Sequence, residues 1–384
     1  MRSLLFIPVV FSILFSCRSH QKSNDPVETI KVDGPDEFTK ANFSDFFSSW
    51  KLIPLETNKE SLIGSIDRIT LYDHRLYILD RQTNSVLVFN DTGKFERRIH
   101  NIGQGPGEYI GIMDFAIDKE RRQIIVHSHR PYRMLYYDLN GKFLHEEKMS
   151  TFYSGIACVQ SDLIEINRRK DLNNMAFVKD LGHGGVRKYV PFSKKEELFE
   201  SFGTVFPYIV QSEHTYITLP SESTIYQFNG EGVYPKYFID FGRHTIPESQ
   251  FGNGNTAKKI YRDAQRNWDG ISISNFRECK DHICFTYGNS VVVIYSKKDK
   301  TARTFTVALN TLGFLPFQNY FGHDGDDNNL ISIYESSTFR EQMKAFKGDS
   351  VIWGKEAEEI KHIEGLVKDN DNPLLLVCNL KPSL

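Results

Sequence analysis

Short apolar segments separated by turn residues follow one another along most of the chain. Two units of this kind match in detail, each with four strand-like segments: 66–71, 75–80, 86–89 and 91–95, then 114–118, 123–126, 134–137 and 139–143. The turn glycines of the two units, Gly93 and Gly141, are 48 residues apart, from 93 to 141. Such segments, rich in Val, Ile, Phe and Tyr, predict β-strands. A fixed period of this size indicates a repeat architecture.

Fainter copies of the unit follow later in the chain, at 163–166, 215–228, 282–295 and 320–334, which makes six in all. Six four-stranded antiparallel sheets fit a β-propeller, in which radial repetition leaves only short, protected sheet edges. The segments 50–55 and 373–378 have no unit of their own, so we expect these N- and C-terminal strands to pair and close the ring. The sequence thus predicts an all-β, six-bladed β-propeller, with helical insertions near 256–268 and 339–367.

The first residues of the chain carry a different pattern. Arg2 precedes an almost unbroken apolar run over 4–15, and Cys17 follows that run. The run is too short to span a bilayer and is typical of a signal-peptide core. Its end resembles a bacterial lipobox, which implies cleavage before Cys17 and lipidation of that residue. We therefore expect a signal peptide over 1–16, a lipidated cysteine with a flexible tether over 17–35, and the propeller over 36–384.

Several segments resemble a known family: 52–57, 103–109 (Gly-Gln-Gly-Pro-Gly-Glu-Tyr), the turns 91–95 and 140–143, and 371–376. In these segments the chain is similar to the six-bladed β-propeller lipoproteins common in Bacteroides-type bacteria, which are relatives of the NHL-repeat propellers. The resemblance implies an outer-membrane lipoprotein. The basic residues just after Cys17 favour a periplasm-facing position. The resemblance implies little about function, because propellers serve many tasks.

The charge balance narrows the function classes. The chain has 47 Lys and Arg residues against 49 Asp and Glu residues, so its formal net charge is −2. This balance argues against nucleic-acid binding by bulk charge, which needs a basic surface. Hydrophobic residues make up 40% of the chain and aromatic residues 13%, which is compatible with a sizeable core rich in strand-forming aromatics.

Candidate ligand-binding residues gather in loops that a propeller would place on one face, namely the loops between the second and third strands and the crossovers between blades. The cationic candidates are Arg81, His129, Arg130, Arg133, Arg168, Arg169 and Lys170. The other candidates are Glu108, Tyr109, Tyr132 and Trp268. An arc of such cations suits an anionic ligand, for example a uronate or sulfated glycan, through guanidinium contacts. The alternative interpretation is that these are ordinary solvated loop charges.

Two further clusters are weaker candidates. Asp324, Asp326 and Asn328 match the first positions of a calcium-binding loop, but Asn329 stands where such a loop has glycine. Cys279 and Cys284 flank a short segment, so a tight hairpin would set them opposite each other and allow a disulfide in an oxidising compartment. The alternatives are a plain turn and two buried thiols. We predict neither a metal site nor a cofactor.

The sequence lacks the Gly-x-Ser-x-Gly motif of many serine hydrolases. We therefore expect a monomeric ligand-binding or scaffold module rather than an enzyme, attached to the membrane through its lipid anchor alone. Two alternatives stay open: a propeller hydrolase or lyase acting on a glycan or peptide, and a protein–protein platform coupled to an outer-membrane transporter. The expected partner is a glycan or an envelope protein, and not a nucleic acid.

Overall fold

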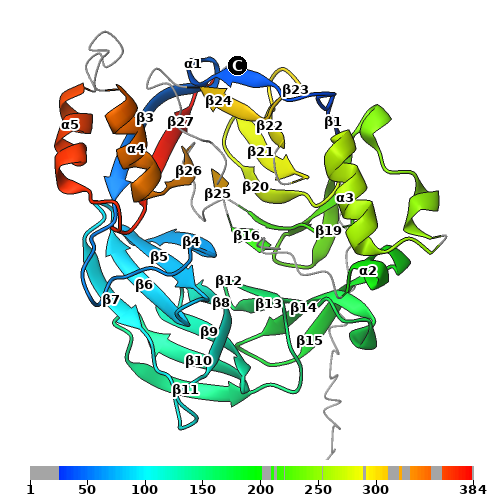
Figure 1. Ribbon diagram of the computed structural model, residues 1–384. Coiled ribbons are helices and arrows are strands. Elements are labelled where there is room, and N and C mark those ends of the chain that lie inside the picture. The colour runs from blue at the N-terminus through cyan, green and yellow to red at the C-terminus, as the bar shows by residue number, and fades with distance from the viewer. Residues whose placement is uncertain are drawn as a thin grey trace, which may run out of the picture.

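The predicted architecture is confirmed: the computed structural model is a ring of small antiparallel sheets, the blades of a six-bladed β-propeller (Figure 1). It describes residues 26–200, 209–211, 214–219, 221–252, 254–288, 291–309, 320–321, 329–346 and 357–382. Each blade has a core of four antiparallel strands, and in the first five blades these four follow one another directly in the chain. The first strand of each blade lies nearest the centre of the ring.

The strands of blades 1 to 3 are β4 (Arg68–Tyr72), β5 (Arg75–Asp80), β6 (Ser85–Asn90) and β7 (Phe95–Ile99); β8 (Gly111–Asp118), β9 (Gln123–Arg130), β10 (Tyr132–Asp138) and β11 (Phe143–Lys148); and β12 (Gly155–Val159), β13 (Asp162–Ile166), β14 (Asn174–Asp180) and β15 (Val186–Pro191). The strands of blades 4 to 6 are β16 (Ile209–Gln211), β17 (Thr215–Ile217), β18 (Thr224–Phe228) and β19 (Val233–Asp240); β20 (Ser274–Glu278), β21 (His282–Tyr287), β22 (Val291–Ser296) and β23 (Thr301–Phe305); and β25 (Tyr320–Phe321), β26 (Asn329–Tyr334), β27 (Leu374–Leu380) and β3 (Phe47–Pro54).

Blade 6 closes the ring as predicted. Its outer strand β3 comes from the N-terminal part of the chain and pairs antiparallel with β27, with Leu52 opposite Leu376. Asn372 strengthens this closure, because its side-chain amide donates to the carbonyl oxygens of Glu56 and Ser61 at 2.8 Å each. The same side chain accepts a hydrogen bond from the Ile63 nitrogen at 2.9 Å. Strands from the N-terminal and C-terminal parts of the chain therefore meet in one sheet.

Each interface between neighbouring blades holds one cluster of buried apolar side chains. The inner strands are covered on both faces, so they are apolar in runs rather than in alternation. The run Val86–Phe89 of β6 shows this: Val86 and Val88 pack against blade 2, whereas Leu87 and Phe89 pack against blade 6. The apolar runs that repeat in the sequence thus arise because each sheet is buried on both faces.

The matching turns of blades 1 and 2 have the same hydrogen bonds. Asn90 Oδ1 accepts from the backbone nitrogens of Thr92 and Lys94, and Asp138 Oδ1 accepts from those of Asn140 and Lys142. Gly93 and Gly141 both have a φ of 85°, which favours glycine. These local bonds explain why the two units match so closely in sequence.

Helices occur in the insertions between strands, as the sequence predicts for the regions near 256–268 and 339–367. They are α1 (Phe43–Phe46), α2 (Lys194–Phe199), α3 (Ala257–Asn267), α4 (Ser336–Phe346) and α5 (Ala357–Leu366), with short 3-10 turns at η1 (Lys170–Leu172), η2 (Gly242–His244) and η3 (Glu248–Phe251). Helices α3, α4 and α5 lie at the rim of the ring (Figure 1). Within the described part of the chain, no helix combines the length and apolarity needed to cross a membrane.

The segment expected as a tether, 17–35, is partly folded, so that prediction needs correction. Strand β1 (Glu28–Lys31) pairs in parallel with β19 and adds a fifth strand to blade 4. Ile30 is fully buried there, and Glu28 Oε1 accepts from the Tyr295 hydroxyl at 3.1 Å. A second N-terminal strand, β2 (Lys40–Asn42), pairs with β24 (Val307–Leu309). The folded domain therefore begins before residue 36.

Candidate functional site

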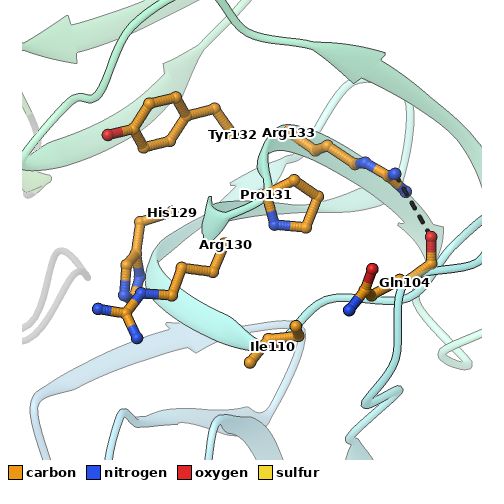
Figure 2. Close-up of a pocket in the computed structure, with 7 residues that line it drawn as sticks. All are labelled: Gln104, Ile110, His129, Arg130, Pro131, Tyr132 and Arg133. Atoms are coloured by element: carbon orange, nitrogen blue, oxygen red, sulfur yellow. Dashed lines mark hydrogen bonds between the residues drawn. The ribbon is translucent and has the colours of Figure 1, made fainter.

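A pocket of about 540 Å³ opens beside blade 2, between the crossover that enters the blade and the loop that joins β9 to β10 (Figure 2). Its lining residues are Gln104, Ile110, His129, Arg130, Pro131, Tyr132 and Arg133. Strand pairing positions the loop residues, because His129 of β9 lies opposite Tyr132 of β10. The pocket thus rests on the ends of two paired strands.

The His129 ring packs against Gly111 of β8. A β-carbon on Gly111 would lie only 2.5 Å from His129 Cε1, so a larger residue at this position would displace the imidazole. His129 Nδ1 is buried and has no hydrogen-bond partner in the described part of the chain. Burial first, and then the positive charges of Arg130 and Arg81, lower the pKa of His129 below its usual value. Both effects favour the neutral imidazole.

Arg133 holds the crossover against blade 2. Its Nη1 donates to the Gly105 carbonyl oxygen at 3.0 Å and lies 3.1 Å from the Glu146 carboxylate. The same carboxylate accepts from the Gly107 nitrogen at 3.0 Å. The charge of Arg133 is therefore compensated locally, and its role at the pocket wall is structural.

Arg130 differs from Arg133. Its backbone oxygen accepts from the Ile110 nitrogen at 2.8 Å, which fixes the residue at the pocket. Its side chain is exposed and makes no hydrogen bond or ion pair with any residue that the structure describes. Figure 2 shows the guanidinium beside the His129 ring. Five N–H donors of a charged group are thus available to a ligand.

An apolar surface lies next to this cation. Tyr132 is 41% exposed and Ile110 is 43% exposed, although both are large. The ring centres of Tyr132 and Phe152 lie 6.5 Å apart, and those of Phe152 and His127 lie 5.9 Å apart. The pocket therefore combines one uncompensated guanidinium with an aromatic wall.

The other predicted cations have local partners, so the continuous arc expected from the sequence is not formed. Arg81 lies 2.7 Å from Asp67, Arg169 lies 2.9 Å from Asp171, and Lys170 lies 2.7 Å from Glu197. Arg168 donates to the carbonyl oxygen of Phe199 at the end of α2. Arg168 and Lys170 thereby link the loop after β13 to α2, whereas Arg169 pairs within its own loop. Of the predicted cations, His129, Arg130 and Arg133 line the pocket.

Three of the predicted ligand-binding residues, Tyr109, Glu108 and Trp268, stabilise the fold away from the pocket. Tyr109 is fully buried, and its hydroxyl donates to the carbonyl oxygens of Asn84 and Ile99. Glu108 Oε2 accepts from the Gly105 nitrogen at 2.8 Å and so shapes the crossover itself. Trp268 ends α3 and packs against the apolar cluster between blades 4 and 5. None of the three lines the pocket.

The two cysteines of the predicted pair lie close together as free thiols. Strand pairing places Cys284 opposite Arg277, yet the side chains of Cys279 and Cys284 still hydrogen-bond each other in the cluster between blades 5 and 6. The Cys279 nitrogen bonds the His282 carbonyl oxygen. Cys17 and the calcium candidates Asp324, Asp326 and Asn328 lie outside the described residues. The described ranges contain no group of three or more His, Cys, Asp or Glu side chains that could hold a metal ion.

The sequence did not single out a buried carboxyl group between blades 2 and 3. Glu165 of β13 is 2% exposed, and its Oε1 has no hydrogen-bond partner among the described residues. Burial raises the pKa of Glu165 to about 7, although Lys179 and a hydrogen bond from Tyr153 lower it. The available signal was the pattern Leu-Ile-Glu-Ile, a single acid within a strand buried on both faces.

The fold and this pocket define the chain as a six-bladed β-propeller with a small cationic and aromatic site at one interblade crossover. It belongs to the family described as Domain of unknown function (DUF4934), whose model matches residues 27–379. Among solved structures it is similar to a Bacteroides fragilis NCTC 9343 protein described as exported, with a TM-score of 0.70, 19% identity, and coverage of 93% of this chain and 100% of that one. It also matches a DUF4221 family member from Bacteroides vulgatus ATCC 8482, with a TM-score of 0.48, 11% identity, and coverage of 87% and 97%. A comparison with curated proteins gave no match.

Proposed function

We propose that the protein is a cell-envelope binding module that takes an anionic glycan, carrying a carboxylate or sulfate, in the pocket beside blade 2. The observation that carries this proposal is the uncompensated guanidinium of Arg130 next to the exposed ring of Tyr132. Guanidinium groups bind carboxylates and sulfates through paired, charge-assisted hydrogen bonds. An exposed aromatic ring offers apolar area at low cost in conformational entropy, against which the C–H face of a sugar ring packs.

Binding is favoured over cleavage at this site. Glycoside hydrolysis usually needs a pair of Asp or Glu side chains on either side of the scissile bond. None of the seven residues that line the pocket is Asp or Glu. The Glu146 carboxylate behind Arg133 is engaged in an ion pair with that residue. We therefore propose recognition rather than turnover at this pocket.

The proposed location rests on the N-terminal pattern. The apolar run before Cys17 supports export and lipidation, and the similar Bacteroides fragilis protein is itself described as exported. We propose an outer-membrane lipoprotein that faces the periplasm. Mass spectrometry of the protein from the envelope tests this: a diacylglyceryl group on Cys17 is expected, and Cys17→Ser should abolish it. An unmodified N-terminus upstream of Cys17 would contradict the proposal.

Thermal-shift and calorimetric titrations of residues 18–384, which include the whole described fold, test the ligand. Acidic oligosaccharides should stabilise the protein, by roughly 2.7 kcal/mol at about 100 times the dissociation constant. Neutral oligosaccharides should not. Arg130→Ala should abolish the effect, whereas Arg169→Ala is the matched control, because Arg169 is an exposed loop arginine that already has Asp171 as its partner. The absence of any shift with acidic glycans would overturn the proposal and favour a protein partner.

A further inference from the structure

We propose that an anion bound at Arg130 makes His129 take up a proton, so that the pocket binds acidic ligands more tightly as the pH falls. This inference rests on the proposed function, because it concerns the same pocket. It assigns to His129 a regulatory role that is distinct from the direct contact by Arg130. It also defines the ligand more closely, as one whose acidic group reaches both side chains.

The geometry places the two side chains at one wall of the pocket. His129 and Arg130 are the last residues of β9, and Figure 2 shows the imidazole beside the guanidinium. Gly111 leaves room for the ring over β8. His129 Nδ1 is buried without a hydrogen-bond partner in the described part of the chain, so the ring is not committed to another side chain through this atom. An anion at Arg130 would therefore meet an imidazole that is free to take up a proton.

Burial first, and then the charged groups around it, favour the neutral form of His129 in the free pocket. From β9 it faces Arg130 and the buried His127, and the loop after β5 brings Arg81, whose charge is shared with Asp67. From β10 come the uncharged Tyr132 and Arg133, which is paired with Glu146. The strand β8 contributes Gly111, which does not titrate. Among these cations, Arg130 is the one without an ion-pair partner in the described part of the chain.

An anion bound at Arg130 reverses this situation. Its negative charge offsets the guanidinium, and it can accept a hydrogen bond from the protonated imidazole. The bound state then holds more protons than the free state, so by linkage the affinity rises as the pH falls through the pKa of His129 in the complex. Each unit by which the ligand raises that pKa corresponds to about a tenfold gain in affinity at acidic pH.

Isothermal titration calorimetry in two buffers of different ionisation enthalpy measures the proton uptake directly. The probes are a galacturonic acid tetrasaccharide, which carries carboxylates, and a heparin-derived tetrasaccharide, which also carries sulfates. For the tetrasaccharide that binds, we expect a fraction of one proton to be taken up near pH 6, and a dissociation constant about 3- to 10-fold lower at pH 5.5 than at pH 8. His129→Gln should abolish both effects. His183→Gln is the matched control, because that imidazole is exposed and pairs with Asp180 away from the pocket.

A measurement without glycan separates this inference from the proposed function. The NMR titration of His129, assigned by its loss in His129→Gln, should show a higher pKa in 100 mM sodium sulfate than in sodium chloride of equal ionic strength. In the free protein, Arg130→Gln should also raise that pKa. If glycans bind through Arg130 with no proton uptake, the coupling is overturned and the proposed function stands. If no glycan binds and sulfate leaves the His129 titration unchanged, both are overturned.

Discussion

Arg68 Nη1 lies 3.1 Å from Asp114 Oδ2, and this buried ion pair joins the innermost strands of blades 1 and 2. The same pair reaches blade 3, because Arg68 Nη1 donates to the Ile156 carbonyl oxygen at 2.9 Å and Asp114 Oδ2 accepts from the Ile156 nitrogen at 2.8 Å. Arg68 is 5% exposed and Asp114 is 7% exposed. Two side chains thus connect three neighbouring blades near the centre of the ring.

Asp114→Ala should strongly destabilise the protein. The substitution leaves the Arg68 guanidinium buried without its counter-ion, and breaking a buried pair in this way costs about 3–5 kcal/mol. Urea unfolding followed by tryptophan fluorescence measures the change. As a control, Asp171→Ala breaks an ion pair whose side chains are both about half exposed, and should cost under about 1 kcal/mol. Equal losses in the two variants would contradict a special role for the central pair.

Glu165→Gln should remove a loss of stability that the parent protein shows as the pH rises from 5 to 8. In the folded protein the pKa of Glu165 is raised from 4.5 to about 7, mainly by burial. The stability that this carboxyl contributes is therefore complete below pH 4.5 and is lost as the pH rises to about 7, a change of roughly 3 kcal/mol at most. Urea unfolding at several pH values should show that the glutamine variant lacks this loss. An identical pH dependence in the variant and the parent protein would sink the prediction.

His127→Phe should have the opposite effect on the pH dependence. Burial lowers the pKa of His127 from 6.5 to about 4, so this residue contributes stability above pH 6.5 that is lost as the pH falls to about 4. Its ring lies near Phe152 and Tyr153, and a phenylalanine ring suits that environment. Between pH 4.5 and 6.5 the effects of His127 and Glu165 oppose each other. The variant should therefore lose stability steadily as the pH rises from 4.5 to 7, while His183→Gln should behave as the parent protein does.

Gly93→Ala should destabilise the ring more than Gly141→Ala, although both glycines have a φ of 85° in equivalent turns. The left-handed backbone alone costs roughly 1–2 kcal/mol for an alanine. At Gly93, a β-carbon would also lie 2.2 Å from the Pro54 carbonyl oxygen at the end of β3, whereas at Gly141 the nearest contact is 3.4 Å from Ile99 Cγ1. Thermal unfolding of the two variants gives the comparison. A larger loss in Gly141→Ala would show that the contact with Pro54 is easily relieved.

The blades could be predicted from the sequence because their signals are local. Runs such as Val86–Phe89 record burial on both faces, and the bonds of Asn90 and Asp138 fix turns within a few residues. The added strand β1 could not be predicted in this way. Ile30 is the only large apolar residue between Glu28 and Lys31, and the strand forms because the edge of β19 is available in the folded ring.

The site could be predicted in part, for a related reason. His129, Arg130 and Tyr132 stand in the segment that the sequence predicts as a loop between the second and third strands of blade 2. They are the last residues of β9 and the first of β10, and they line the pocket. Arg81 does not line the pocket, because it pairs with Asp67, the residue just before β4, and this contact is not visible in the sequence. The closeness of Cys279 and Cys284, by contrast, follows from the short hairpin that the sequence predicts there, and their side chains do interact.

The pairing of β3 with β27 also sets an order of events during synthesis. Leu52 leaves the ribosome early, but its partner Leu376 is added 324 residues later, from 52 to 376. Contacts between residues so distant in sequence form slowly. Until β27 arrives, blade 6 lacks the strand that joins β26 to β3, and the ring is open. A chain threaded through a translocation pore during this interval would have no completed ring to unfold.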